Sequence, residues 1–153
     1  MNESRLAAIQ VERRSLAAAI FIGERLDYVQ VRQLTSGHEQ AEASAVGFVN
    51  WIAAAFEVES AALEQFGPDS MTRRAQIRQA VLQALRQNGI PVWEIGKLEL
   101  FDAFGVPPLK NRRELREVTS SLWPILKNRR ADATILDAVA LGLYVQTDRR
   151  FLH

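Results

Sequence analysis

Cysteine is absent from the 153 residues, and histidine occurs only twice. Without thiols the chain has no disulfide, no thiolate zinc site and no cysteine nucleophile. No apolar stretch approaches the roughly eighteen residues that a membrane-spanning helix needs. The N-terminal residues MNESRLAAIQ lack the apolar core of a secretion signal. We therefore expect a cytoplasmic protein that has no membrane partner.

The composition indicates neither a disordered chain nor two domains. Hydrophobic residues make up 48% and charged residues 24% of the chain, which is the balance of an ordinary globular protein. The length suffices for one hydrophobic core and gives no reason to expect a second. We expect a single domain over residues 1–153.

Basic residues are concentrated in the middle of the chain, although the formal net charge is only +1. Residues 1–72 contain five Lys/Arg and ten Asp/Glu, whereas residues 73–130 contain twelve Lys/Arg and five Asp/Glu. Such an asymmetry indicates one positively charged face. That face is either a set of solvated helix surfaces or a contact surface for nucleic acid.

Short apolar runs dominate the first 34 residues. RLAAIQV at Arg5 to Val11 and SLAAAIFI at Ser15 to Ile22 are separated by three charged residues. Gly23 marks a turn before RLDYVQVRQL at Arg25 to Leu34. Because β-branched and aromatic residues favour strands, we expect three antiparallel strands joined by short links.

Helical patterns alternate with short buried runs in the rest of the chain. The run from Val58 to Leu63 is expected to be a fourth strand and the run from Ile90 to Ile95 a fifth. This order of elements predicts an α/β fold of the ribonuclease H type, with a mixed five-stranded sheet of three antiparallel and then parallel strands, flanked by helices. The expected helices are one that ends near Phe56, one from an Asp69-Ser70 cap to Gly89, a short one within 97–106, one from Lys110 to Trp123, and one that starts at Asp132 or Thr134. Amphipathic spacing places Arg78 on the outer side of the second of these helices. In the helix from Lys110 to Trp123 it places Leu115, Val118 and Leu122 inside and Arg112, Arg113 and Arg116 outside.

Five segments carry a resemblance to a known family. They are AIQVERRSLAAAIF at 8–21, AALEQF at 61–66, IPVWEIGKLELFDAFGV at 90–106, KNRRELREVTSSLW at 110–123 and ADATILDAVALGL at 131–143. In this order and at this spacing, the chain resembles the RuvC-like Holliday junction resolvases of the ribonuclease H superfamily over nearly its full length. The resemblance implies binding of branched DNA, a homodimer, and Mg²⁺ or Mn²⁺ as the cofactor of an active member.

The resemblance also assigns positions to metal ligands. Carboxylates of the first strand, the fourth strand and the last helix hold two Mg²⁺ ions in the family, and these ions activate water and neutralise the scissile phosphate. By this resemblance Glu64 and Asp137 occupy two ligand positions, whereas Gln10 and Thr134 occupy the other two. Because Mg²⁺ prefers carboxylate oxygens, we expect weak metal binding and an endonuclease activity that is impaired or lost.

Other acids could replace the missing ligands, and simpler roles stay open for the retained ones. Glu12 lies two residues after Gln10 on the same strand face, whereas Asp132 suits a helix N-cap better than a ligand position. Glu64 could be a solvated strand end and Asp137 a surface acid. Alternatively, the Gln10 amide could hydrogen-bond both carboxylates in place of a metal.

Three functions remain as hypotheses: a binder of branched or structured nucleic acid with an eroded catalytic centre, an active endonuclease that uses Glu64, Asp137 and Glu12, and a dimeric interaction scaffold. DNA is the expected nucleic acid, and RNA stays open. Basic residues that flank the acids would contact phosphates, and such contacts make affinity salt-dependent. The candidates are Arg73, Arg74, Arg78, Lys110, Arg112, Arg113, Arg116, Lys127, Arg129 and Arg130.

Overall fold

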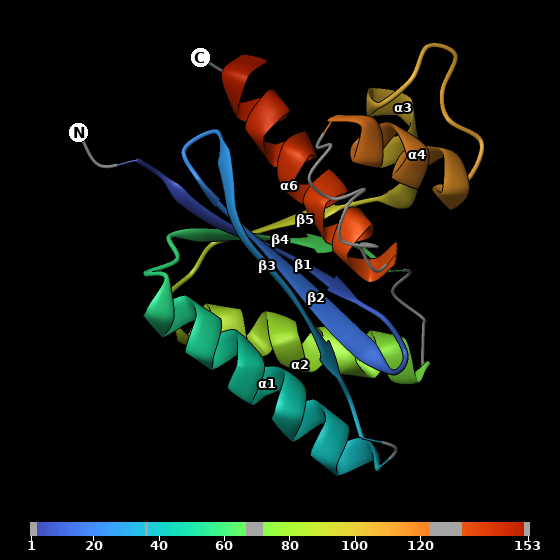
Figure 1. The fold of residues 1–153 in the computed structure, drawn as a ribbon. Helices are drawn as coiled ribbons and strands as arrows, with labels where there is room; N and C mark the ends of the chain where they lie inside the picture. The colour runs from blue at the N-terminus through green and yellow to red at the C-terminus, as the bar shows by residue number, and fades with distance from the viewer. Residues whose placement is uncertain (1–2, 36, 67–71, 123–132, 152–153) are drawn as a thin grey trace.

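The computed structural model describes residues 3–35, 37–66, 72–122 and 133–151, and its centre is one five-stranded sheet with the order β3-β2-β1-β4-β5 (Figure 1). β1 pairs antiparallel with β2, and β2 with β3. β4 runs parallel to both β1 and β5. The predicted mixed sheet is therefore confirmed. The strands are β1 (Arg5–Val11), β2 (Ser15–Ile22), β3 (Arg25–Gln33), β4 (Ser60–Glu64) and β5 (Val92–Ile95).

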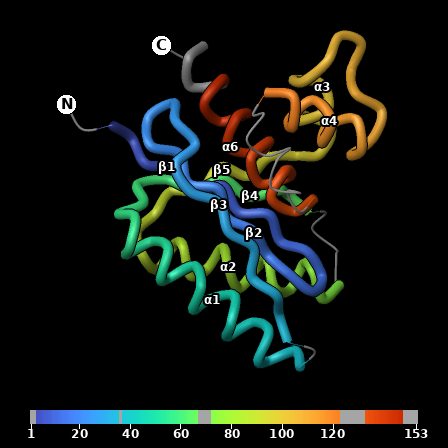
Figure 2. The backbone as a smooth tube through the Cα atoms, viewed as in Figure 1, coloured from blue at the N-terminus to red at the C-terminus, as the bar shows by residue number. Residues whose placement is uncertain are grey.

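Helices cover both faces of the sheet, as Figures 1 and 2 show. α1 (His38–Ala55) and α2 (Arg73–Gln87) lie on one face. α6 (Ala133–Phe151) packs across β1, β2 and β4 on the other face, with α3 (Lys97–Ala103) and α4 (Arg112–Leu122) beside it. Among the described helices, none combines the length and the apolar content needed to cross a membrane.

β1, the central strand of the sheet, is buried on both of its faces. Successive side chains of a strand point to opposite faces, so Ala7 and Ile9 pack in the core under α1 and α2, while Leu6 and Ala8 pack in the core under α6. A strand that is covered on both faces reads as a continuous apolar run. This burial explains why RLAAIQV shows no polar alternation, and it makes the single polar residue near its end conspicuous.

Two element boundaries differ from the sequence-based expectation. The fourth strand does not begin at Val58, because the Val58 N–H still bonds to the Ala53 carbonyl at the end of α1. The strand instead includes Glu64 as its last residue. The second helix is capped by Thr72, whose hydroxyl accepts a hydrogen bond from the Ala75 N–H at 3.2 Å. The expected cap at Asp69-Ser70 lies outside the described residues, as does Asp132 before α6.

The buried side of α4 is rotated relative to the expectation. Leu122, predicted to face the interior, is 54% exposed, and Thr119 is buried instead. The Thr119 hydroxyl donates to the Leu115 carbonyl, which satisfies its hydrogen bond within the helix. The helix therefore turns the side that carries Arg112 and Arg116 toward α6, where both guanidinium groups find a carboxylate.

The close packing of α6 on β2 gives a stability prediction. A Cβ added at Gly142 would lie 2.1 Å from the Phe21 ring, whereas one added at Gly47, in α1, meets nothing within 4 Å. We expect Gly142→Ala to lower the free energy of unfolding by about 1–3 kcal/mol through overpacking. Gly47→Ala should raise it by about 0.5–1 kcal/mol because alanine favours the helix. Urea denaturation measures both variants, and equal effects would contradict the packing of α6.

Candidate functional site

Two polar residues lie buried at the same end of neighbouring parallel strands. Gln10 in β1 is 1% exposed, and Glu64 at the end of β4 is 5% exposed. The pairing of Ile9 with Leu63 places them one residue beyond the last ladder pair. The Gln10 side-chain amide donates to Glu64 Oε2 at 2.8 Å. The open question about Glu64 is thus answered in part, because its carboxylate is buried and not solvated.

Asp137 reaches this cluster from α6 and is 1% exposed. Arg112, the first residue of α4, bridges the two acids: its Nη2 lies 2.5 Å from Glu64 Oε1 and its Nη1 lies 3.5 Å from Asp137 Oδ2. Arg116 binds the same aspartate with two hydrogen bonds, from Nε to Oδ1 at 3.1 Å and from Nη2 to Oδ2 at 2.9 Å. Asp137 is therefore no surface acid.

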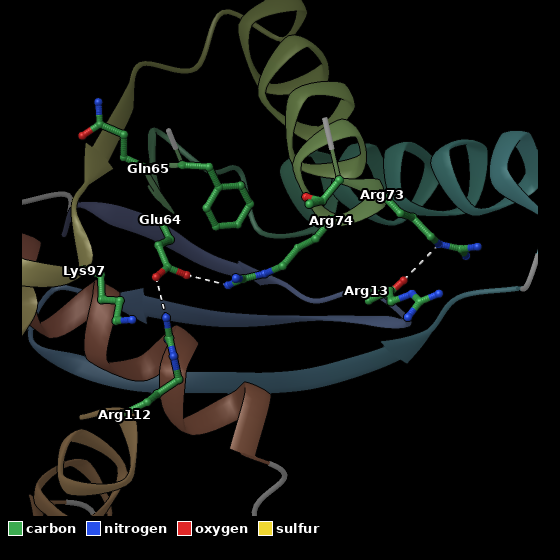
Figure 3. Close-up of a pocket in the computed structure, with 9 residues that line it drawn as sticks. Arg13, Glu64, Gln65, Arg73, Arg74, Lys97 and Arg112 are labelled. Carbon is green, nitrogen blue, oxygen red and sulfur yellow. Dashed lines mark hydrogen bonds and ion pairs between the residues drawn. The ribbon is translucent and has the colours of Figure 1, made fainter. Parts of the chain in front are cut away.

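A third arginine enters from α2. Arg74 Nη2 donates to Glu64 Oε2 at 2.7 Å (Figure 3). Its Nε donates to the Val11 carbonyl at 2.7 Å. The same Nε lies 3.4 Å from Glu12 Oε2. Glu12 also accepts from the Gln10 amide at 3.2 Å, so it folds back to the cluster. The Gln10 amide therefore donates hydrogen bonds to Glu64 and Glu12. Among the described residues, Asp137 is instead contacted by Arg112 and Arg116.

The charges of this cluster balance. Its acids are Glu12, Glu64 and Asp137, and its bases are Arg74, Arg112 and Arg116. Burial alone would raise the pKa of the Glu64 carboxyl, but the Gln10 hydrogen bond and the Arg112 and Arg74 charges outweigh it and hold that pKa below its usual value. Glu64 is therefore an anion at neutral pH that its neighbours fully compensate.

The donor set does not fit a pair of magnesium ions. Both Glu64 carboxylate oxygens accept bonds from side-chain N–H groups, and Gln10 turns its amide donor toward them. Within the described parts of the chain, no group of three or more His, Cys, Asp or Glu residues is arranged to hold a metal ion. At the helical ligand position that the resemblance implies, Thr134 carries a hydroxyl in place of a carboxylate, and Mg²⁺ prefers carboxylate ligands.

An open cleft of about 790 Å³ lies beside Glu64 (Figure 3). Because Glu64 is buried and paired with arginines, the wall that the cleft presents is cationic. Arg73, Arg74, Lys97 and Arg112 stand at the first positions of α2, α3 and α4, so helix starts that are far apart in the sequence converge here. In the part of the chain that the structure describes, the lining residues are Arg13, Glu64, Gln65, Phe66, Thr72, Arg73, Arg74, Lys97 and Arg112.

All of the predicted basic residues except Arg78 fall into three groups. Arg73, Arg74 and Arg112 line the cleft, and Arg116 binds Asp137 behind it. Lys110 is exposed, and Arg113, with 88% of its side chain exposed, pairs with Glu117. Lys127, Arg129 and Arg130 lie outside the described residues.

Arg78 was predicted to lie on the outer side of its helix, and this was wrong. It is 8% exposed, its Nε donates to the Glu64 carbonyl at 2.8 Å, and its guanidinium pairs with Glu94. Burial of an arginine needs such partners. Arg78 therefore holds the ends of β4 and β5 against α2.

The sequence analysis missed five of the described cleft residues: Arg13, Gln65, Phe66, Thr72 and Lys97. The Arg74 guanidinium lies over the Phe66 ring, 4.3 Å from its centroid. Phe66 and Lys97 each follow the end of a parallel strand by two residues. Because ligands of open α/β sheets bind beyond the carboxyl ends of their strands, this position was the available signal.

Comparison with known proteins relates the fold to RuvC and to Holliday junction resolvases. No protein-family model and no curated protein sequence matches the chain. Among solved structures, that of T. thermophilus RuvC in complex with a Holliday junction substrate superposes with a TM-score of 0.75 at 19% identity, over 92% of each chain. The yeast mitochondrial Holliday junction resolvase gives 0.68 at 8% identity, over 95% of this chain and 80% of its own.

A viral protein extends this likeness. The fowlpox virus resolvase with Holliday junction DNA gives a TM-score of 0.60 at 16% identity, over 94% of this chain and 97% of its own. At such low identities the matches show the fold. The predicted ribonuclease H-like fold and its likeness to RuvC-type resolvases are therefore confirmed, whereas the roles of the site residues stay predictions.

Removal of the Glu64 charge tests the compensated cluster. Glu64→Gln keeps the shape but leaves Arg74 and Arg112 without their shared anion, so we expect the free energy of unfolding to fall by roughly 3 kcal/mol. Glu117→Gln, at an exposed helix pair, should change it by less than about 0.5 kcal/mol. Urea denaturation at neutral pH measures both. A stabilised Glu64→Gln variant would show that the acids repel one another instead.

The acid limb of stability should depend on the same carboxylate. Because its folded-state pKa lies below the usual value of about 4.5, the stability that Glu64 contributes is complete above that value. It is lost as the pH falls through the lowered pKa. The difference in unfolding free energy between the wild type and Glu64→Gln should therefore shrink on acidification. A difference that stays constant down to acid pH would contradict the assignment.

Proposed function

We propose that the protein binds branched or structured nucleic acid, with a four-way DNA junction as the first expectation, and that metal-dependent endonuclease activity is lost or strongly impaired. The observation that carries this proposal is the cleft beside Glu64. Among the described residues, five basic side chains line it, and the one acid of this described lining is buried and paired with arginine. Its chemistry is complementary to a phosphate backbone.

Helix position strengthens the case for an anionic ligand. The first turn of a helix carries partial positive charge and usually favours acids. The first turn of α2 contains no acid and begins with Arg73 and Arg74, and α4 begins with Arg112. Like charges are thus gathered at the mouth of the cleft, and a bound phosphate would relieve their repulsion.

The choice of a branched ligand rests on the fold. Solved structures with this fold include RuvC and the fowlpox virus resolvase, each bound to a Holliday junction. A homodimer, which the sequence resemblance implies, would present two such clefts to one junction. Structured RNA offers the same phosphate chemistry, so it belongs among the ligands to be tested.

Loss of cleavage is supported by the state of the acids. Hydrolysis of a phosphodiester by two metal ions needs carboxylates that are able to receive cations. Here the oxygens of Glu64 and Asp137 are already bound by guanidinium groups. An active endonuclease remains the second candidate, because Glu12 lies in the same cluster as the alternative ligand set requires.

Binding and cleavage should separate experimentally. We expect fluorescence anisotropy with a labelled four-way DNA junction to show binding in the presence of a chelator, with an affinity that falls steeply as salt rises. Incubation of the same junction with Mn²⁺ should leave it intact. Cleavage that Glu64→Gln and Asp137→Asn abolish would establish the endonuclease instead. No binding to DNA junctions or to structured RNA at low salt would leave the interaction scaffold.

A further inference from the structure

The acids and arginines of the site differ in exposure. Glu64 and Asp137 are 5% and 1% exposed. Arg112 and Arg74 have side-chain exposures of 21% and 29%, and both line the cleft together with Glu64. The guanidinium groups therefore present more surface to a ligand than the carboxylates do.

Each of these two guanidinium groups can hold a carboxylate and a second anion together. A guanidinium carries five N–H donors in a planar fork. Arg112 contacts Glu64 through Nη2 and Asp137 through Nη1, and Arg74 contacts the Val11 carbonyl through Nε and Glu64 through Nη2. Among the described residues these contacts do not use every N–H group of either guanidinium, and both side chains line the cleft, so further donors are available to a phosphate there.

We propose that Arg74 and Arg112 form a phosphodiester-binding pair, and that Glu64 and Asp137 are positioning residues that hold it in place. The pair takes the place of cations between carboxylates and phosphate, so that phosphate binds without a divalent metal. This inference rests on the proposed function and deepens it, because it names the residues that contact the nucleic acid.

Both arginines are fixed before a ligand arrives. Arg74 is held by the Val11 carbonyl and by Glu64, and its guanidinium lies over the Phe66 ring. Arg112 is held from two elements, by Glu64 of β4 and by Asp137 of α6. Such preorganisation lowers the entropy that binding must cost. A lysine at either position would keep the charge but lose the fork.

Matched Arg→Lys variants test the pair at constant net charge. Binding of the labelled junction is measured in chelator for the wild type and for Arg112→Lys, Arg74→Lys, Arg86→Lys and Arg25→Lys. Arg86, in the last turn of α2, and Arg25, in β3, are exposed and are not among the described lining residues of the cleft. We expect Kd to rise about tenfold for each cleft variant, as for the loss of one good bidentate contact, and to change less than about twofold for the controls.

The positioning role has its own measurement. If Glu64 holds Arg112 in its geometry, the Arg112→Lys effect on Kd should shrink to about threefold or less in a Glu64→Gln background, because the two residues then act as one unit. An unchanged tenfold effect would overturn that role. Thermal unfolding of each variant shows that comparisons are made on folded protein.

The outcomes separate this inference from the proposed function. If the junction binds but cleft and control variants weaken it equally, the arginine pair is wrong and nucleic-acid binding stands. Thermal shift with inorganic tripolyphosphate gives an arm without nucleic acid: the wild type should be stabilised in chelator and Arg112→Lys should not. Stabilisation by tripolyphosphate without junction binding would keep the pair and overturn the proposed function. Absence of both would overturn both.

Discussion

The Glu64 carboxylate is buried at the end of β4. The surrounding structure depends on the groups that balance its negative charge. An unpaired buried charge costs several kcal/mol, so the strand end is stable because Gln10, Arg74 and Arg112 surround the anion. These partners come from β1, α2 and α4. The same residue binds Arg78 through its backbone carbonyl, which adds β5 through Glu94. Through its carboxylate and its carbonyl, Glu64 therefore connects the strand ends at this side of the sheet with α2 on one face and α4 on the other.

That arrangement also decides where the cleft lies. Parallel strands end at one edge of the sheet, and the helices that follow β4 and β5 begin there. Arginine and lysine at the first positions of α2, α3 and α4 are therefore gathered by topology rather than by sequence proximity. The acids neutralise the arginines nearest to them, and Arg13, Arg73 and Lys97 add positive charge on the cleft wall. A positive potential in a concave, open site is the property expected for capture of a polyanion.

The sheet could be predicted from the sequence, because strand order and helix periodicity are local patterns with few topological solutions. The expectation that Gln10, Glu64 and Asp137 lie near one another came from the resemblance to the RuvC-like resolvases. The arginine partners of the acids were not predicted. The outward assignment of Arg78, and the inward assignment of Leu122, followed amphipathic periodicity, which ranks arginine as a surface residue. Tertiary pairing overrode that rule at Arg78, Arg112 and Arg116. Long side chains reach their partners by rotamer choice, and one sequence holds no signal for that choice.

The arginines around the acids make the present state of the site self-consistent. A carboxylate in place of Gln10 would face Glu64 Oε2 at the position where an amide now donates a hydrogen bond, and two anions in contact oppose one another unless a cation lies between them. Arg74 already binds that oxygen, and Arg112 binds the other one, Oε1. Acids and arginines in this site are therefore linked: a ligand set for Mg²⁺ needs both more carboxylates and fewer guanidinium contacts. Either change alone unbalances a partly buried cluster of three negative and three positive side chains.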